Sequence, residues 1–172
     1  MTTALQSLLK PLKRIEHGLD MILQPVVFAA MAGLIGVITL QIVSRVLFSA
    51  VGWTEEVSRF LLVWITFLAG TLAFQRGRHI AVTFAVDALP LRLRQAARIA
   101  ATLAVLAFTV ALVVIGYRYM QVQSFQKSAS LRLSMTYVYA VIPLTAALMS
   151  WYTFIDLLEL IINGERVEDS AP

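Results

Sequence analysis

Four long stretches without a charged side chain constrain this chain more than any other feature. They cover residues 21–44, 60–75, 99–117 and 133–155, and they contain 24, 16, 19 and 23 residues. A helix needs about 20 apolar residues to cross a hydrocarbon core of roughly 30 Å. A soluble domain of 172 residues cannot bury this much apolar surface, because surface grows too fast relative to volume. The chain is therefore expected to be an all-α integral membrane protein with four transmembrane helices.

The predicted membrane domain covers residues 21–160, and residues 161–172 form a tail. The predicted spans lie at about 21–44, 57–77, 97–119 and 133–156. The second uncharged stretch is short, but the stems of Arg59 and Arg76 can lie along hydrocarbon while their charged heads stay in the interface. Pro143, near the middle of the fourth span, predicts a packed kink whose freed carbonyl is satisfied locally. Pro90 suits the first position of the third helix, which should run to about Gln126.

Residues 1–20 form a predicted amphipathic segment on the membrane surface. Leucine or isoleucine recurs there at helical spacing, at positions 5, 8, 9, 12, 15 and 19, while Lys10, Lys13 and Arg14 fall largely elsewhere. Pro11 leaves open whether this segment is one helix or two. A signal peptide is the rival interpretation, because Ala30-Met31-Ala32 resembles a cleavage site. Against it, acidic residues interrupt the basic region and the apolar run continues well beyond Ala32. The first helix is therefore expected to be retained.

The distribution of Lys and Arg predicts the orientation. If both termini are cytoplasmic, nine of these residues lie inside and five outside. Cytoplasmic loops of membrane proteins carry the excess of positive charge. Both termini are therefore expected in the cytoplasm. The basic residues stand singly or in small groups at span ends, which predicts contact with membrane lipids and not with nucleic acid.

The uncharged stretches exclude several kinds of function. Transport pathways usually need ionisable groups or broken helices inside the membrane, and a haem anchor needs histidine ligands within the bundle. The only histidines, His17 and His79, lie outside the spans, there is no cysteine, and no zinc motif such as H-E-x-x-H occurs. The sequence therefore predicts no enzyme activity, no metal, no cofactor and no transport by this chain alone.

Small residues recur on the predicted spans at intervals of four. Ala29 and Gly33 share one face of the first span, and Ala69, Ala73 and Gly77 share one face of the second. Such faces let transmembrane helices approach closely. Packing within this bundle and docking against another membrane protein both explain them.

The segment Trp53–Arg59 is the densest polar cluster beside a span. Thr54 suits a helix N-cap, and Glu55 and Glu56 would then lie in the first turn, where acids favour the positive end of the helix dipole. Glu55 and Arg59 are four residues apart and can pair on one face. A capped helix start explains these residues, and so does a partner that receives them at the membrane edge.

The motifs in this region resemble the small membrane subunit of TRAP transporters, the DctQ-like family. They read Trp53-Thr54-Glu55-Glu56, Arg59-Phe60-Leu61-Leu62-Val63-Trp64, Phe67-Leu68-Ala69-Gly70 and Arg76-Gly77-Arg78-His79-Ile80. The match covers about 40 residues, and the four-span layout extends the likeness over most of the chain. The family pattern commonly has an acid shortly after the His-Ile pair. In this chain the corresponding residues are Ala81-Val82-Thr83, so the acid is missing there. Any role that it has in the family is either absent from this chain or taken by Asp87.

The resemblance implies a scaffold subunit of a sodium-coupled transporter that takes up organic acids. Its partners would be a large, elevator-type membrane subunit and a periplasmic substrate-binding protein. A four-helix assembly or anchor protein without a transport role is the alternative. The candidate partner-binding residues are Arg45, Trp53, Glu55, Glu56, Arg59, Trp64 and His79.

Overall fold

The computed structural model describes residues 2–47, 51–86 and 91–163, with side chains described at 12, 14–47, 51–77 and 93–161. The predicted all-α membrane fold is confirmed, because four helical segments are long and apolar enough to cross a membrane. In chain order the elements are α1 (Thr2–Leu47), α2 (Gly52–Val86), α3 (Leu91–Val122), the 3-10 turn η1 (Gln123–Phe125), α4 (Met135–Tyr139) and α5 (Val141–Asn163).

The first helix answers the question that Pro11 left open. α1 is one helix of 46 residues, and Pro11 lies inside it without a break in helical structure. The predicted amphipathic segment therefore continues directly into the first span. α3 ends close to the predicted position, with η1 extending it to Phe125, whereas Pro90 lies outside the described residues. The exact limits of the spans within these helices stay a prediction.

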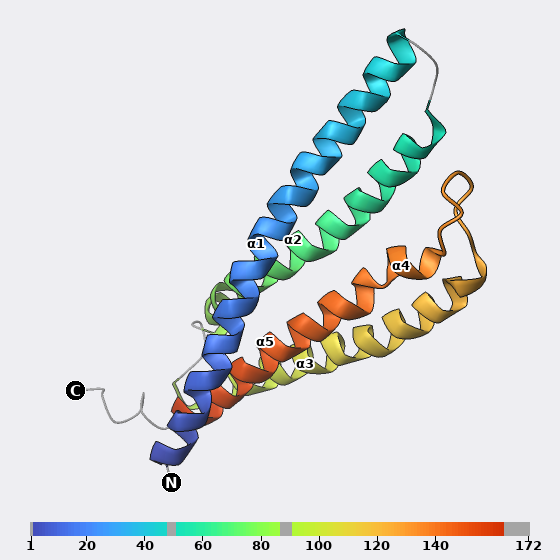
Figure 1. Ribbon diagram of the computed structural model, residues 1–172. Coiled ribbons are helices and arrows are strands. Elements are labelled where there is room, and N and C mark those ends of the chain that lie inside the picture. The colour runs from blue at the N-terminus through green and yellow to red at the C-terminus, as the bar shows by residue number, and fades with distance from the viewer. Residues whose placement is uncertain (1, 48–50, 87–90, 164–172) are drawn as a thin grey trace.

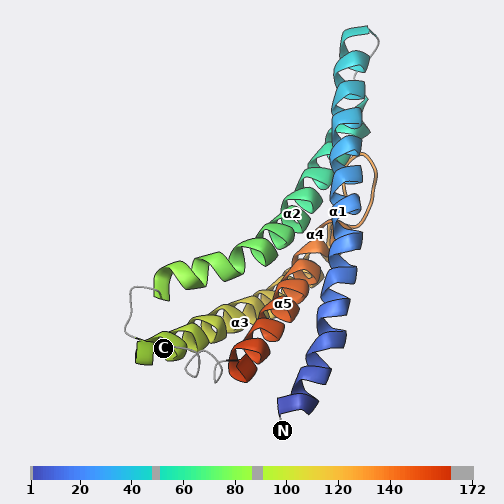
Figure 2. The same ribbon diagram turned by 90° about the vertical axis from the view of Figure 1, so that its left-hand side faces the viewer.

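The helices form two antiparallel pairs that spread apart in one direction. α1 packs against α2, and α3 packs against α5 (Figure 1). The pairs meet through contacts of α5 with α1 and α2. We call the side where α1 begins and α5 ends the terminal end, and the side that holds residues 44–47, 51–56 and 126–134 the loop end. The last turns of α2 bend away from α1 toward the beginning of α3 (Figure 2).

The core lies where the two pairs meet. It consists of Leu23 and Val27 on α1, Leu68 and Leu72 on α2, and Val141 on α5. Within the described part of α1, no residue from 28 to 47 is buried. The loop-end half of α1 therefore contacts little besides α2 and presents its apolar side chains outward.

The fourth span is interrupted near the predicted kink. Proline has no backbone N–H, so Pro143 cannot donate to the carbonyl of Tyr139, four residues earlier. α4 ends at Tyr139 and α5 begins at Val141, and the amide of Leu144 resumes the helical pattern by donating to Ala140 O at 3.3 Å. α3 fits closely against this interruption, because a Cβ atom at Gly116 would lie 2.9 Å from Ile142 Cγ2 and 3.2 Å from the backbone nitrogen of Pro143. A glycine at 116 is therefore required for the close approach of α3 to α5.

Replacing Gly116 with alanine should destabilise the bundle. Alanine gains about 1 kcal/mol over glycine in helix propensity, but overpacking a tight contact costs about 1–3 kcal/mol. Gly70→Ala is the matched control, because a Cβ there meets no atom within 4 Å. We expect a lower melting temperature for Gly116→Ala and an unchanged or higher one for Gly70→Ala, measured by intrinsic fluorescence in detergent. Equal melting temperatures for the two variants would contradict this packing.

Candidate functional site

The threonine hydroxyls buried inside the spans are satisfied by their own helices. The buried threonines donate to backbone carbonyls three or four residues earlier, at 2.7 to 3.0 Å: Thr71, Thr102, Thr109, Thr145 and Thr153. Such bonds are the expected solution where no water reaches the backbone. They leave the described interior of the bundle without a hydroxyl aimed at a substrate.

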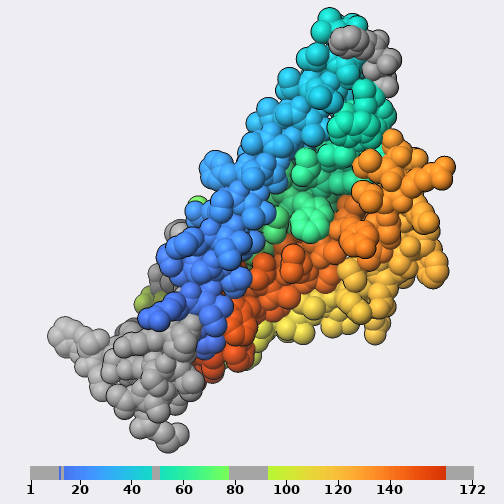
Figure 3. Space-filling view, in the orientation of Figure 1, coloured from blue at the N-terminus to red at the C-terminus, as the bar shows by residue number. Residues whose placement is uncertain are grey.

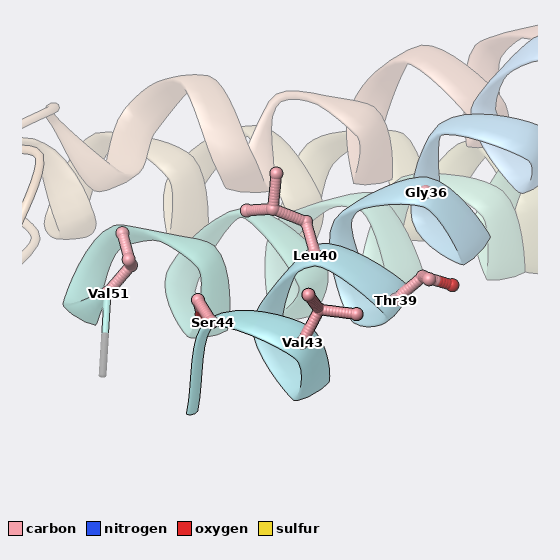
Figure 4. Close-up of a pocket in the computed structure, with 6 residues that line it drawn as sticks. All are labelled: Gly36, Thr39, Leu40, Val43, Ser44 and Val51. Atoms are coloured by element: carbon pink, nitrogen blue, oxygen red, sulfur yellow. The ribbon is translucent and has the colours of Figure 1, made fainter. Parts of the chain in front are cut away.

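A hollow between the end of α1 and the start of α2 is equally poor in polar groups. It has a volume of about 580 Å³, and its lining comes from six residues: Gly36, Thr39, Leu40, Val43, Ser44 and Val51 (Figure 4). The hydroxyls of Thr39 and Ser44 donate to Ile35 O at 2.8 Å and Gln41 O at 3.0 Å. The hollow therefore offers apolar surface and no arrangement that would hold a polar substrate.

The polar side chains that do join different helices lie at the ends of the bundle. Toward the terminal end, Gln75 of α2 donates to Asp20 of α1 and, at 3.4 Å, to Glu16 Oε1. The hydroxyl of Tyr152 on α5, which is fully buried, donates to Asp20 Oδ1 at 3.3 Å. Asp20 thus ties three helices together. Sequence analysis missed this junction, although the four-residue spacing of Glu16 and Asp20 places both acids on one helix face.

The predicted N-cap role of Thr54 is wrong. α2 begins at Gly52, so Thr54 already lies in the first turn and is fully buried. Its hydroxyl donates to Val51 O at 2.7 Å instead of accepting a backbone N–H. The helix starts earlier than expected because Gly52 and Trp53, which carry no capping side chain, adopt helical backbone.

Glu55 and Arg59 form the predicted pair on one face of α2. Arg59 Nη2 lies 2.5 Å from Glu55 Oε1, and the two side chains are 68% and 62% exposed. Exposed pairs at this spacing contribute about 0.3–0.5 kcal/mol. The pair is therefore a weak support of the helix start and stays accessible to a partner.

Glu56 makes a contact of a different kind. Its carboxylate accepts hydrogen bonds from Ser128 Oγ at 2.8 Å, Ser130 N at 2.8 Å and Leu131 N at 3.1 Å. An ionised carboxylate only accepts hydrogen bonds, and three donors converge on it here. Glu56 therefore fastens the 126–134 segment to the first turn of α2.

The 126–134 segment also holds itself together. The amide of Ser128 donates to Leu133 O at 2.8 Å, and the amide of Met135 donates to Gln126 O at 3.0 Å. Arg132 turns the chain with a φ of 52°, a left-handed conformation that is uncommon outside glycine. With the Glu56 contacts, these bonds fix the segment as a compact hairpin.

The structure separates the seven predicted partner-binding residues into groups. Trp64 is half-buried and packs against the chain's own core, and Glu56 bonds the 126–134 segment. The side chain of His79 lies outside the described residues. The exposed members all lie at the loop end: Arg45, Trp53, Glu55 and Arg59. Among the residues with described side chains, no three His, Cys, Asp or Glu residues stand close enough to hold a metal ion.

Comparison with known protein families decides the identity of this fold. Residues 34–163 match the family described as the DctQ component of tripartite ATP-independent periplasmic (TRAP) transporters. This chain belongs to the DctQ family. It is the small permease subunit of a TRAP transporter, which confirms the sequence resemblance, and it is a multi-pass protein of the inner membrane. The family implies partnership with a large membrane subunit and a substrate-binding protein.

Individual relatives carry names of the same kind. The sialic acid TRAP transporter small permease protein SiaQ of Vibrio cholerae is 29% identical over 142 residues, which cover 82% of this chain and 80% of the relative. A putative TRAP transporter small permease protein of Haemophilus influenzae is 32% identical over 80 residues, covering 46% and 50%. The isethionate TRAP transporter permease protein DctMQ of Oleidesulfovibrio alaskensis is 31% identical over 136 residues, which cover 74% of this chain and 21% of that longer protein.

Membership of the DctQ family agrees with the polar groups described above. Relatives in this family are subunits of transporters and not enzymes, as the sequence predicts. The polar contacts described between helices lie toward the two ends, and the buried threonine hydroxyls inside the spans bond to their own helices. The hydrogen bonds described above therefore connect parts of this subunit to each other: they join its helices and attach the 126–134 segment to α2.

Removing the charge of Glu56 should release the 126–134 segment. In Glu56→Gln the side chain loses one acceptor oxygen, so the amides of Ser130 and Leu131 should lose protection and exchange their hydrogens several-fold faster. Hydrogen–deuterium exchange of peptides that cover residues 126–134 measures this effect. Glu55→Gln is the matched control, because Glu55 bonds only Arg59 among the described contacts. Equal exchange in both variants would show that Glu56 does not hold the segment.

Proposed function

We propose that this DctQ-family subunit is the scaffold of a sodium-coupled TRAP transporter that takes up organic acids. In this proposal the large membrane subunit binds the substrate and sodium and moves like an elevator, while the four helices described here hold it in the bilayer. Both termini lie in the cytoplasm, so the loop end faces the periplasm. The observation that carries the proposal is the absence of charged side chains from the four uncharged stretches.

The absence of charge in the spans supports this division of work. No Asp, Glu, His, Lys or Arg lies within the four uncharged stretches, and the buried threonine hydroxyls already bond to their own helices. A sodium or carboxylate site in a membrane needs oxygen ligands, positive charge or broken helices at the midplane. The substrate and sodium sites therefore belong on the partner subunit.

The names of two relatives support the substrate class. One is a sialic acid transporter subunit and another is an isethionate transporter permease. Sialic acid carries a carboxylate and isethionate a sulfonate, so both are organic anions at neutral pH. An organic anion is therefore the class of substrate that we propose for this transporter.

The exposed ridge of α1 is the proposed contact with the large subunit. Four apolar side chains at intervals of seven residues follow one face of α1, and they are 59% to 76% exposed: Met21, Phe28, Ile35 and Ile42. Side chains that recur every seven residues form a continuous seam for a second helix. Transmembrane helices associate by such packing, because lipid itself already solvates apolar side chains. The exposed residues at the loop end, Arg45, Trp53, Glu55 and Arg59, would extend this contact into the membrane edge.

Truncating the ridge should weaken assembly. The double variant Phe28→Ala/Ile35→Ala keeps α1 apolar but removes the side chains that fill the proposed seam. We expect the amount of large subunit that co-purifies with the tagged variant to fall several-fold. The matched control is Phe108→Ala/Ile115→Ala on α3, because both side chains are exposed to a similar degree, 62% each. Loss of the large subunit from the control, with wild-type recovery for the α1 variant, would place the contact on α3 instead.

A further inference from the structure

We propose that the 126–134 segment, together with Arg118, Phe125 and Tyr137 beside it, docks an acidic face of the soluble substrate-binding protein. This inference rests on the proposed function, since it requires the loop end to face the periplasm. It goes beyond that function by assigning the docking contact to particular side chains of the small subunit.

Charge is the first argument for this surface. The sequence has no acidic residue between Asp87 and Asp156, whereas Arg118, Lys127 and Arg132 all fall in this interval and are exposed. The acid that touches the segment is Glu56, and its carboxylate already accepts three hydrogen bonds from it. The surface therefore presents three basic side chains with one engaged acid beneath them, and it complements an acidic partner.

Exposed aromatic side chains are the second argument. Phe125 is 92% exposed and Tyr137 is 72% exposed, and they flank the segment on its two sides. Tyrosine and arginine dominate the binding energy of many protein interfaces, and phenylalanine is also enriched there. A surface with two aromatic side chains among three basic ones therefore has the composition of a docking site.

The shape of the segment is fixed before any partner binds. The bonds of Ser128, Met135 and Glu56 hold the hairpin. The flanking helices are also joined, because the rings of Tyr119 on α3 and Tyr139 on α4 pack edge to face with centroids 5.0 Å apart. A surface that is already ordered loses less conformational entropy on binding. The segment can therefore bind without first being arranged.

Position favours a soluble partner over the large subunit or lipid. The segment stands out from the bundle across from α1, which carries the proposed contact with the large subunit (Figures 1 and 3). Its exposed residues are polar or small apart from Leu133: Gln126, Lys127, Ala129, Ser130 and Arg132. Such a surface belongs in water beyond the lipid, where a periplasmic protein can reach it.

The test uses the complex with its large subunit in nanodiscs of zwitterionic lipid. Lys127→Glu/Arg132→Glu reverses two charges, and Lys127→Arg/Arg132→Lys is the matched control that keeps them. We expect the dissociation constant of the substrate-loaded binding protein to rise at least several-fold for the reversed variant and to stay near wild type for the control. The difference should shrink as salt is added, because screening weakens exposed charges. Phe125→Ala should weaken binding at every salt concentration.

Four results would overturn the docking proposal. In the binding experiment, the contradicting results are unchanged binding by the reversed variant and binding that requires anionic lipid in the nanodisc. Loss of the large subunit from the reversed variant is the third. The fourth is labelling of Ala129→Cys only from the cytoplasmic side. An impermeant maleimide applied to intact cells should instead label Ala129→Cys and leave His17→Cys unlabelled.

Failure of the proposed function gives a different set of results. In that case charge-dependent binding persists, while proteoliposomes with the wild-type complex and binding protein take up no organic acid.

Discussion

The constraint on which this structure depends is that polar groups in hydrocarbon must be satisfied inside the protein. An unpaired hydrogen-bonding group there costs several kcal/mol. Most buried polar side chains described here meet this constraint in one of two ways. Hydroxyls within the spans bond to their own helix, as Thr71 and Thr145 do. Polar contacts between helices lie near the ends, at Asp20 on the terminal side and at Glu56 on the loop side.

The helices pack closely over one half of the bundle, whereas α1 is exposed over the other half. The core and the Asp20 junction join α1, α2 and α5 over the half nearest the terminal end. Beyond Val27, α1 has no buried residue in its described part and exposes a ridge of large apolar side chains. Lipid can solvate that ridge, so it costs little in a membrane, and it is free to pack against another transmembrane protein. Such a ridge suits a subunit that assembles with a larger membrane subunit.

The sequence predicts the number and type of the helices well, because four uncharged stretches leave few other structures. It also predicts the Glu55–Arg59 pair, which depends only on helical spacing. It places the helix start wrongly at Thr54, since the first turn forms without a capping side chain. The hydrogen bonds of Glu56 could not be predicted from the sequence, because its donors lie 72 to 75 residues away in the chain. Such a contact depends on how the two helix pairs pack, and no local pattern encodes that packing.

The central claim is that this chain supports transport without carrying substrate itself. The most direct test is uptake of sialic acid or isethionate into liposomes that contain the purified chain alone, with an inward sodium gradient. The account predicts no uptake above protein-free liposomes, because the four uncharged stretches hold no ionisable side chain and their buried threonine hydroxyls bond to their own helices. Liposomes that also contain the large subunit and the binding protein should take up the organic anion that is the transporter's own substrate. Sodium-driven uptake by the small subunit alone would contradict the account.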